Sequence, residues 1–242
     1  MRIQVYFKRL DYGNIRFHSV AERMAKFVCN HQEYLFHLAY VIRNSKNWTL
    51  KDCQEKLCSY IDPIRPIMTV SNRDEKSDQN YTDILKYSYG LCKKDVDVNI
   101  LRGVFAEWLF SCSCSTKLTR DWKYEVGCAV EIDGKKVEYR NDATAESKKT
   151  VDLGGWNFSE QSGIFAEVKV SPDVFDGKDC GFLQCLRNTL RLYDFVRYKI
   201  YVFSLRQKNL MKERIESLGY PLSSDTVILA PDNLFAEKFF AF

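Results

Sequence analysis

Two short apolar runs separated by turn-forming residues constrain this chain most, because they predict a pair of adjacent strands. The first run ends in Val151-Asp152-Leu153-Gly154, and the second is Phe165-Ala166-Glu167-Val168-Lys169-Val170. The residues between them, Gly154-Gly155-Trp156-Asn157 and Glu160-Gln161-Ser162-Gly163, are typical of turns. We therefore expect the two runs to fold back as a β-hairpin that brings Asp152 toward Glu167.

The second run places an acid and a lysine two residues apart. Because side chains on a strand alternate between its two faces, Glu167 and Lys169 share one face and the apolar residues around them share the other. With Asp152 added, the hairpin gathers two carboxylates and one ammonium group at one spot. A Glu-x-Lys pair alone is common on solvated strands, so the Asp152 run gives this pair its significance.

The order of the remaining patterns indicates an α/β protein. Helical patterns occupy residues 19–43, 49–61, a stretch after Asp95, 182–196 and 211–218. Besides the two runs above, strand patterns occupy residues 1–7, 122–132, 136–140, 200–205 and 226–230. An antiparallel meander followed by alternating helices and strands predicts a mixed central β-sheet flanked by helices, with an N-terminal mostly helical extension.

The N-terminal part differs from the rest in charge. Residues 1–95 hold 16 Lys or Arg against 11 Asp or Glu, whereas residues 96–242 are nearly balanced. A capping box at Ser19-Val20-Ala21-Glu22 predicts the start of the first long helix, and the polar stretch 71–80 predicts a linker or loop. We expect residues 1–95 to form a mostly helical region for assembly or substrate positioning, and residues 96–242 to form the functional core.

The cysteines and the hydropathy exclude several classes of protein. Nine cysteines are scattered along the chain, and Cys112-Ser113-Cys114 has the wrong spacing for a zinc knuckle. No apolar run approaches the ~20 residues that span a bilayer, and no apolar leader starts the chain. We therefore expect a globular protein of the reducing cytoplasm, without structural zinc and without a membrane partner.

A helix acid (Glu107), a hairpin acid (Asp152) and Glu167-Val168-Lys169, followed by a helix and a strand, resemble the motif of the PD-(D/E)xK nuclease superfamily. This superfamily includes restriction endonucleases, recombination exonucleases and junction resolvases. The resemblance covers about residues 96–205 and implies a restriction-endonuclease-like core. The chain departs from the superfamily pattern at Val151, where a proline usually precedes the aspartate.

The resemblance implies a role for each motif residue. Asp152 and Glu167 would hold a divalent metal ion together with the Val168 carbonyl, and Glu107 would complete the outer side of the site. Lys169 would contact the attacking water and the scissile phosphate. An all-oxygen site favours Mg²⁺, for which Mn²⁺ can substitute, over zinc. Such a cation neutralises the charge that phosphodiester hydrolysis builds on the phosphate and acidifies a bound water.

Basic and polar residues near the motif are candidates for contact with nucleic acid. Lys148 and Lys149 lie just before the first run and are candidate phosphate contacts. Gln184, Arg187 and Arg191 form a polar stripe at helical spacing on the helix after Glu-x-Lys. This stripe either meets phosphates or faces solvent, and the sequence favours neither alternative.

From the resemblance we expect a magnesium-dependent DNA endonuclease of a restriction or antiviral-defence type. One alternative is an RNA-directed nuclease on the same scaffold, and another is an inactive nuclease-fold subunit that binds or scaffolds a partner. Cutting both strands of a duplex calls for two sites or for one site acting twice. We therefore expect a homodimer joined through the first long helix, with a monomer that needs a partner subunit as the alternative.

Overall fold

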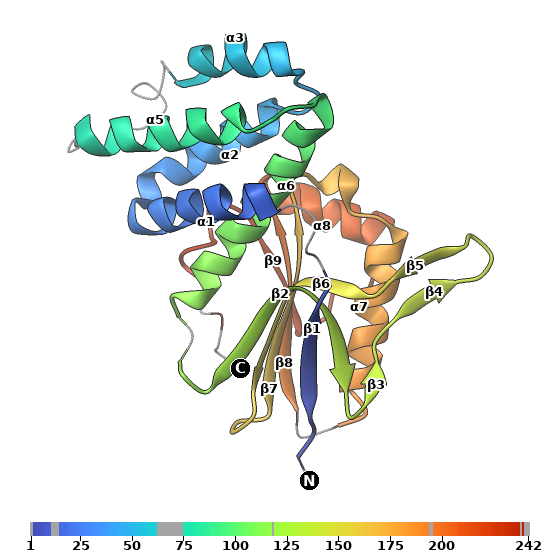
Figure 1. The fold of residues 1–242 in the computed structure, drawn as a ribbon. Coiled ribbons are helices and arrows are strands. Elements are labelled where there is room, and N and C mark those ends of the chain that lie inside the picture. The colour runs from blue at the N-terminus through green and yellow to red at the C-terminus, as the bar shows by residue number, and fades with distance from the viewer. Residues whose placement is uncertain are drawn as a thin grey trace. The chain divides into compact units, whose positions relative to one another are not determined.

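The computed structural model describes residues 2–10, 15–61, 75–117, 119–193, 196–237 and 239. The chain divides into two compact units. The helical unit is Gly13–Ser113, and the sheet unit is Met1–Tyr12 together with Cys114–Phe242. The protein is thus an α/β protein in which a helical region is followed by a mixed seven-stranded sheet with helices, as the sequence predicts (Figure 1).

The helical unit is built around buried aromatic residues. Its helices are α1 (Ile15–Asn30), the 3₁₀ helix η1 (Gln32–Tyr34), α2 (Leu35–Asn44), α3 (Leu50–Ile61), α5 (Glu75–Gly90) and most of α6 (Asp95–Ser115). The ring of Tyr34 packs against those of Phe27 and Tyr81, with centroids 5.2 and 4.7 Å away. His37 is also buried, and its Nδ1 atom lies 2.8 Å from the Tyr81 hydroxyl.

The first long helix is interrupted, which corrects the prediction of one helix over residues 19–43. His31 leaves the helical conformation (φ −133°, ψ 70°) between α1 and η1, and its ring stacks on Phe27. Because α1 begins at Ile15, Ser19 lies inside it and no capping box opens the helix there. The apolar residues of the predicted stripe are buried in the folded chain, so this stripe is not an exposed surface for a second copy.

The predicted linker over residues 71–80 is partly wrong as well. Residues 75–80 form the first turns of α5, while residues 71–74 lie outside the described residues. Two acids, Glu75 and Asp78, lie in the first turn, where they interact favourably with the helix dipole. Asp78 also accepts a hydrogen bond from the Tyr34 hydroxyl (2.5 Å). A polar sequence therefore forms a helix here because tertiary contacts support it.

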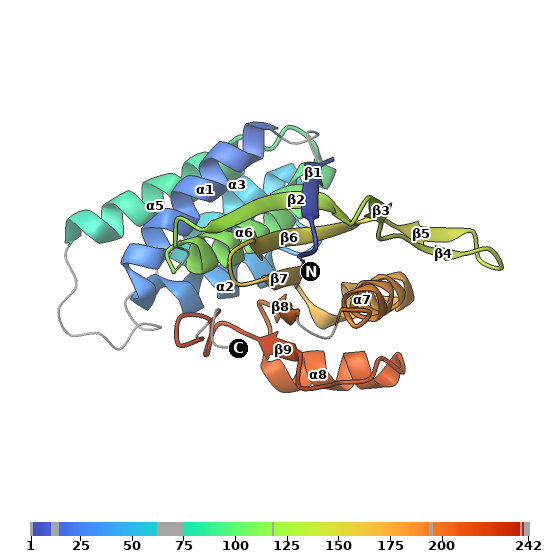
Figure 2. The same ribbon diagram turned by 90° about the horizontal axis from the view of Figure 1, so that it is seen from below.

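The seven-stranded sheet has the order β1-β2-β6-β7-β8-β9, with β3 paired to β2 (Figure 2). Its strands are β1 (Val5–Arg9), β2 (Trp122–Ile132), β3 (Lys135–Lys136), β6 (Thr150–Asn157), β7 (Ser162–Lys169), β8 (Arg197–Ser204) and β9 (Thr226–Leu229). The pairs from β1 to β7 are antiparallel, whereas β7–β8 and β8–β9 are parallel. This division confirms the predicted meander followed by crossovers.

Two details of the meander differ from the prediction. Gly154 to Asn157 were expected in a turn but belong to β6, which is buried over most of its length. Of the predicted strand over residues 136–140, Lys136 pairs with β2 as part of β3 with Lys135, and the N–H of Val137 donates to the Val130 carbonyl. The turn between β2 and β3 is at Asp133 and Gly134, whose φ angles are positive. The chain then leaves the main sheet, and β4 (Tyr139–Asn141) pairs with β5 (Glu146–Lys148) in a separate hairpin.

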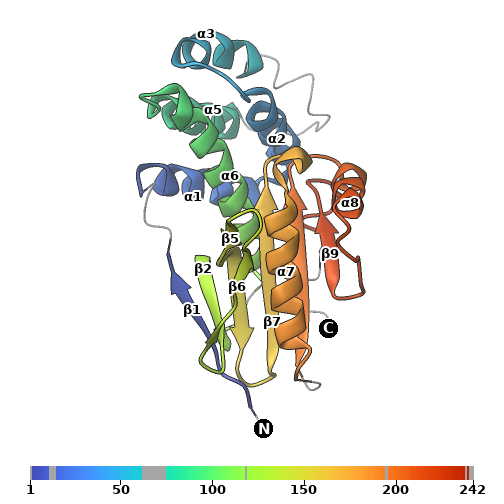
Figure 3. The ribbon, with the colours of Figure 1, turned by 90° about the vertical axis from the view of Figure 1, so that its right-hand side faces the viewer.

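Helices α7 (Gly177–Leu190) and α8 (Lys208–Ser217) follow β7 and β8 and share one hydrophobic core with the sheet (Figure 3). A short 3₁₀ helix, η2 (Pro172–Val174), leads from β7 toward α7. The β4–β5 hairpin packs beside α7, where the ring of Tyr139 leaves no room for a β-carbon at Gly181. This close packing holds Lys148, the last residue of β5, near the start of α7.

The compact units do not follow the predicted division at residue 95. Strand β1 pairs with β2 and belongs to the sheet unit, and most of α6 belongs to the helical unit. The predicted roles of residues 1–95 and 96–242 concern function and stay predictions. None of the helices in the described part of the chain combines the length and apolarity that a membrane span requires.

Candidate active site

Asp152 lies where β6 and β7 stop pairing through their main chains. The last main-chain pair joins Leu153 to Ala166, so Asp152 and Glu167 are the next residues beyond this pair on the two strands. There the Oδ2 atom of Asp152 accepts a 2.6 Å hydrogen bond from the main-chain N–H of Val168. The hairpin thus brings the predicted acid of the first run to the Glu-x-Lys segment of the second, as the sequence predicts.

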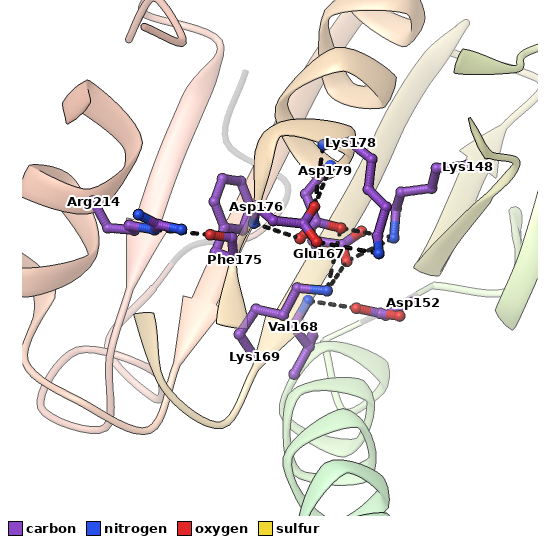
Figure 4. A network of polar contacts seen from close by, with 10 residues as sticks. All are labelled: Lys148, Asp152, Glu167, Val168, Lys169, Phe175, Asp176, Lys178, Asp179 and Arg214. Atoms are coloured by element: carbon purple, nitrogen blue, oxygen red, sulfur yellow. Dashed lines mark hydrogen bonds and ion pairs between the residues drawn. The ribbon is translucent and has the colours of Figure 1, made fainter. Parts of the chain in front are cut away.

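Glu167 is completely buried and is contacted by two lysines (Figure 4). Its Oε1 atom lies 2.5 Å from Nζ of Lys169 and 2.9 Å from Nζ of Lys148. The side chains of these lysines are only 18% and 13% exposed. Glu167 and Lys169 therefore share a face of β7, as alternation predicts, but Lys148 is an ion-pair partner inside the site and not an isolated surface cation.

A third carboxylate, Asp179, completes the cluster. Its Oδ1 atom lies 3.0 Å from Nζ of Lys148 and 3.3 Å from Nζ of Lys169, and the residue is 1% exposed. Asp179 occupies the third position of α7, and its Oδ2 atom accepts a hydrogen bond from the N–H of the N-cap residue, Asp176. The spacing of Asp176 and Asp179 is a helix-start signal in the sequence, but it does not indicate contact with the motif lysines.

The charges of the cluster do not balance when every group is ionised, because three carboxylates face two lysines. Burial, and then the Asp152 carboxylate, raise the pKa of Glu167 to about 8. Burial opposes the charged form of Lys148 and Lys169, but Glu167 and Asp152 outweigh it and raise the pKa of both ammonium groups. Burial would raise the pKa of Asp179, but both lysines lower it. Glu167 therefore takes up a proton, or needs a further cation.

One oxygen of Glu167 shows where such a cation fits. Its Oε2 atom is buried and has no hydrogen-bond partner among the described residues. Within those residues, no group of three or more His, Cys, Asp or Glu side chains is arranged to hold a metal. Mg²⁺ does not require three such side chains, because proteins bind it through one or two carboxylates, with water and substrate phosphate completing its coordination shell. The unpartnered Oε2 atom of Glu167 is thus compatible with a Mg²⁺ ion whose shell water and substrate complete, and the ligand set of Asp152, Glu167 and the Val168 carbonyl stays a prediction.

The remaining predicted site residues have different positions. Glu107 is half-buried on α6 in the helical unit, so its role as an outer ligand stays a prediction. The side chain of Lys149 is 58% exposed, with its Nζ atom 3.6 Å from Oε1 of Glu138. Gln184 donates to Asn188 on the same helix face. Arg191 is 54% exposed, and its Nη2 atom lies 3.2 Å from Asp225.

Arg187 does not fit the predicted contact with nucleic acid, because it is 1% exposed. Its guanidinium donates to the Pro221 carbonyl and the Thr226 hydroxyl, and it lies 3.2 Å from Asp225. The same group lies over the ring of Tyr220. Arg187 is thus a structural residue between α7 and the segment leading into β9, and the polar stripe on α7 is divided between buried and exposed positions.

No model of a known protein family matches this chain, and no curated protein matches its sequence. The resemblance to the PD-(D/E)xK superfamily therefore depends on the motif residues and on the geometry of the cluster around Glu167.

Proposed function

We propose that this protein is a magnesium-dependent nuclease of the PD-(D/E)xK type that acts as a DNA endonuclease, of the restriction or antiviral-defence kind. The observation that carries the proposal is the buried Glu167 carboxylate, which has one oxygen against two lysines and the other without a partner among the described residues. Carboxylates and lysines at the end of a β-hairpin, followed by a helix and a parallel strand, suit hydrolysis of a phosphodiester bond.

Asp152, Glu167 and the Val168 carbonyl are the groups that would hold Mg²⁺, with Glu107 proposed as an outer ligand. Bound there, the cation supplies neutralisation of phosphate charge and a water of lowered pKa. Lys169 holds a proton, because its pKa is raised, and so presents a fixed positive charge to the phosphate oxygens. The Asp152–Val168 hydrogen bond keeps the two strands in the register that this arrangement needs.

Cleavage of closed circular duplex DNA by the full chain tests the proposal. Linear duplex DNA, single-stranded DNA and RNA are the parallel substrates, each with Mg²⁺, with Mn²⁺ and with a chelator. We expect circular DNA to be cut with either cation and to stay intact with the chelator or with the Glu167→Gln variant. Cleavage of RNA alone would identify the RNA-directed alternative, and absence of cleavage on all substrates would identify an inactive binding subunit.

A homodimer is the simplest assembly that supplies two sites for the two strands of a duplex. Because the apolar stripe of α1 and α2 is buried, we propose that any such dimer uses another surface. Light scattering of the full chain during cleavage distinguishes a dimer from a monomer that acts twice.

A further inference from the structure

Three elements that are separate in the sequence bring two lysines onto two buried carboxylates. Lys148 comes from the end of β5, Lys169 from the end of β7, and Asp179 from the first turn of α7. Each lysine contacts both Glu167 and Asp179, at distances between 2.5 and 3.3 Å. The four groups therefore form a closed ring in which lysine and carboxyl side chains alternate (Figure 4).

The ring solves an electrostatic problem. Two ammonium groups that share the Oε1 atom of Glu167 repel each other, so a carboxylate that contacts both of them stabilises the pair. Asp179 supplies this carboxylate, with its Oδ1 atom 3.0 Å from Nζ of Lys148 and 3.3 Å from Nζ of Lys169. Its remaining oxygen is fixed by the N–H of Asp176, so the position of this charge is set by the start of α7.

We propose that Lys148 is a second phosphate-binding lysine of this site, and that Asp179 is the residue that positions Lys148 together with Lys169. The proposal depends on the proposed nuclease function for the identity of the ligand, a phosphodiester.

The exposure of the two lysine side chains supports their assignment as the groups that contact phosphate. Glu167 and Asp179 are 0% and 1% exposed, whereas the two lysine side chains keep 13% and 18% of their surface exposed. An incoming phosphate oxygen therefore meets the ammonium groups before it meets the acids. The pairing of each lysine with two carboxylates limits its rotamers, which reduces the entropy lost when phosphate binds. Asp179 acts through the lysines and is a positioning residue.

Two isosteric variants at the same helix end provide a matched test. Asp179→Asn removes the charge next to the lysines and keeps an oxygen that can accept from the N–H of Asp176. Asp176→Asn removes a charge from the N-cap and keeps a good capping side chain, but Asp176 makes no ion pair with either lysine in the described structure. Thermal unfolding of both variants controls for loss of fold.

The first readout does not depend on nuclease activity. The rates at which Lys148 and Lys169 are acylated by an amine reagent, measured by mass spectrometry without metal or DNA, report how strongly each ammonium group is held by its carboxylate partners. We expect Asp179→Asn to accelerate acylation of both lysines by about tenfold, because each ammonium group loses one of its two carboxylate contacts. Asp176→Asn should leave both rates unchanged. Unchanged acylation in Asp179→Asn would overturn the positioning role.

The second readout is single-turnover cleavage of circular DNA at saturating Mg²⁺. Asp179→Asn should slow cleavage by about 10- to 100-fold, as loss of a supporting residue does. Lys148→Met should slow it by about 100- to 1,000-fold with Mn²⁺ binding retained. A Lys148→Met protein that cuts at the normal rate would overturn its phosphate role. If the unmodified protein cuts no substrate, the proposed function fails, and acylation alone decides the role of Asp179.

Discussion

The Asp152 carboxylate accepts a hydrogen bond from the N–H of Val168 at the point where β6 and β7 separate. A side chain thus continues the hydrogen bonding after main-chain pairing has ended, and it joins the two halves of the motif without a metal ion. The bond uses only the Oδ2 atom of Asp152. Asp152 therefore has a structural role in addition to its proposed role as a metal ligand.

These two roles of Asp152 can be separated by substitution. Asp152→Asn keeps an acceptor for the buried N–H of Val168, whereas Asp152→Ala leaves that group unpaired at a cost of about 1–3 kcal/mol. We expect both variants to lose Mn²⁺ binding in calorimetric titration, and only the alanine variant to unfold at a lower temperature. Wild-type Mn²⁺ affinity in Asp152→Asn would remove Asp152 from the ligand set.

The raised pKa of Glu167 predicts how stability depends on pH when no divalent cation is present. Its pKa rises from 4.5 to about 8 in the folded protein, so the folded state binds the extra proton between these values. The stability from this group is complete below pH 4.5 and is lost as pH rises through 8. At about 1.4 kcal/mol per unit, the loss is on the order of a few kcal/mol.

Glu167→Gln provides the control for this pH dependence, because glutamine cannot release the proton. In chemical denaturation with a chelator present, the free energy of unfolding should fall more between pH 5 and pH 9 for the unmodified protein than for the variant. Equal slopes would mean that Glu167 is ionised throughout, with its charge compensated by Lys148 and Lys169.

Lys169 is expected to act on turnover and not on the metal. Lys169→Met should lower single-turnover cleavage by about 100- to 1,000-fold, because one charge-stabilising group is lost. Binding of Mn²⁺, measured by calorimetry, should be retained, since no oxygen ligand is removed. A loss of Mn²⁺ affinity as large as the loss of rate would instead assign Lys169 to support of the metal site.

Arg187 and Arg191 should behave differently although Arg191, the C-cap residue of α7, follows Arg187 by one turn. Arg187→Met removes one partner of a buried ion pair with Asp225 and should cost about 3–5 kcal/mol of unfolding free energy. Arg191→Ala removes an exposed partner of the same acid and should cost less than about 1 kcal/mol. Denaturant titration measures both. Equal costs would show that the buried contacts of Arg187 contribute little.

Much of the sheet could be predicted from the sequence, because periodicity and turn residues are local signals. Strand β2 has the predicted bounds, and the Asp152 and Glu167 runs pair as expected. The prediction of one helix over residues 19–43 is wrong because it depends on the same local periodicity. Its apolar spacing continues across the break at His31, so the pattern does not show where the backbone turns.

The missed parts of the site depend on contacts between distant segments. Asp179 has an ordinary helix-start pattern, and only the packing of α7 beside β7 brings it to Lys169. Lys148 is the last residue of a hairpin that leaves the main sheet, so its position in the sequence suggested a surface contact. Arg187 has helical spacing typical of a polar stripe, but its partner Asp225 lies just before β9. No local pattern carries this information.

The most direct test of the central claim is the anomalous scattering of Mn²⁺ in crystals of the unmodified protein. We expect one strong peak beside Asp152 and Glu167, at about 2.1 Å from the Oε2 atom of Glu167, the usual distance for a small divalent cation. Crystals at saturating Mn²⁺ with no peak at these carboxylates, and with Lys148 and Lys169 still paired to Glu167, would contradict the proposed metal site and the nuclease function based on it.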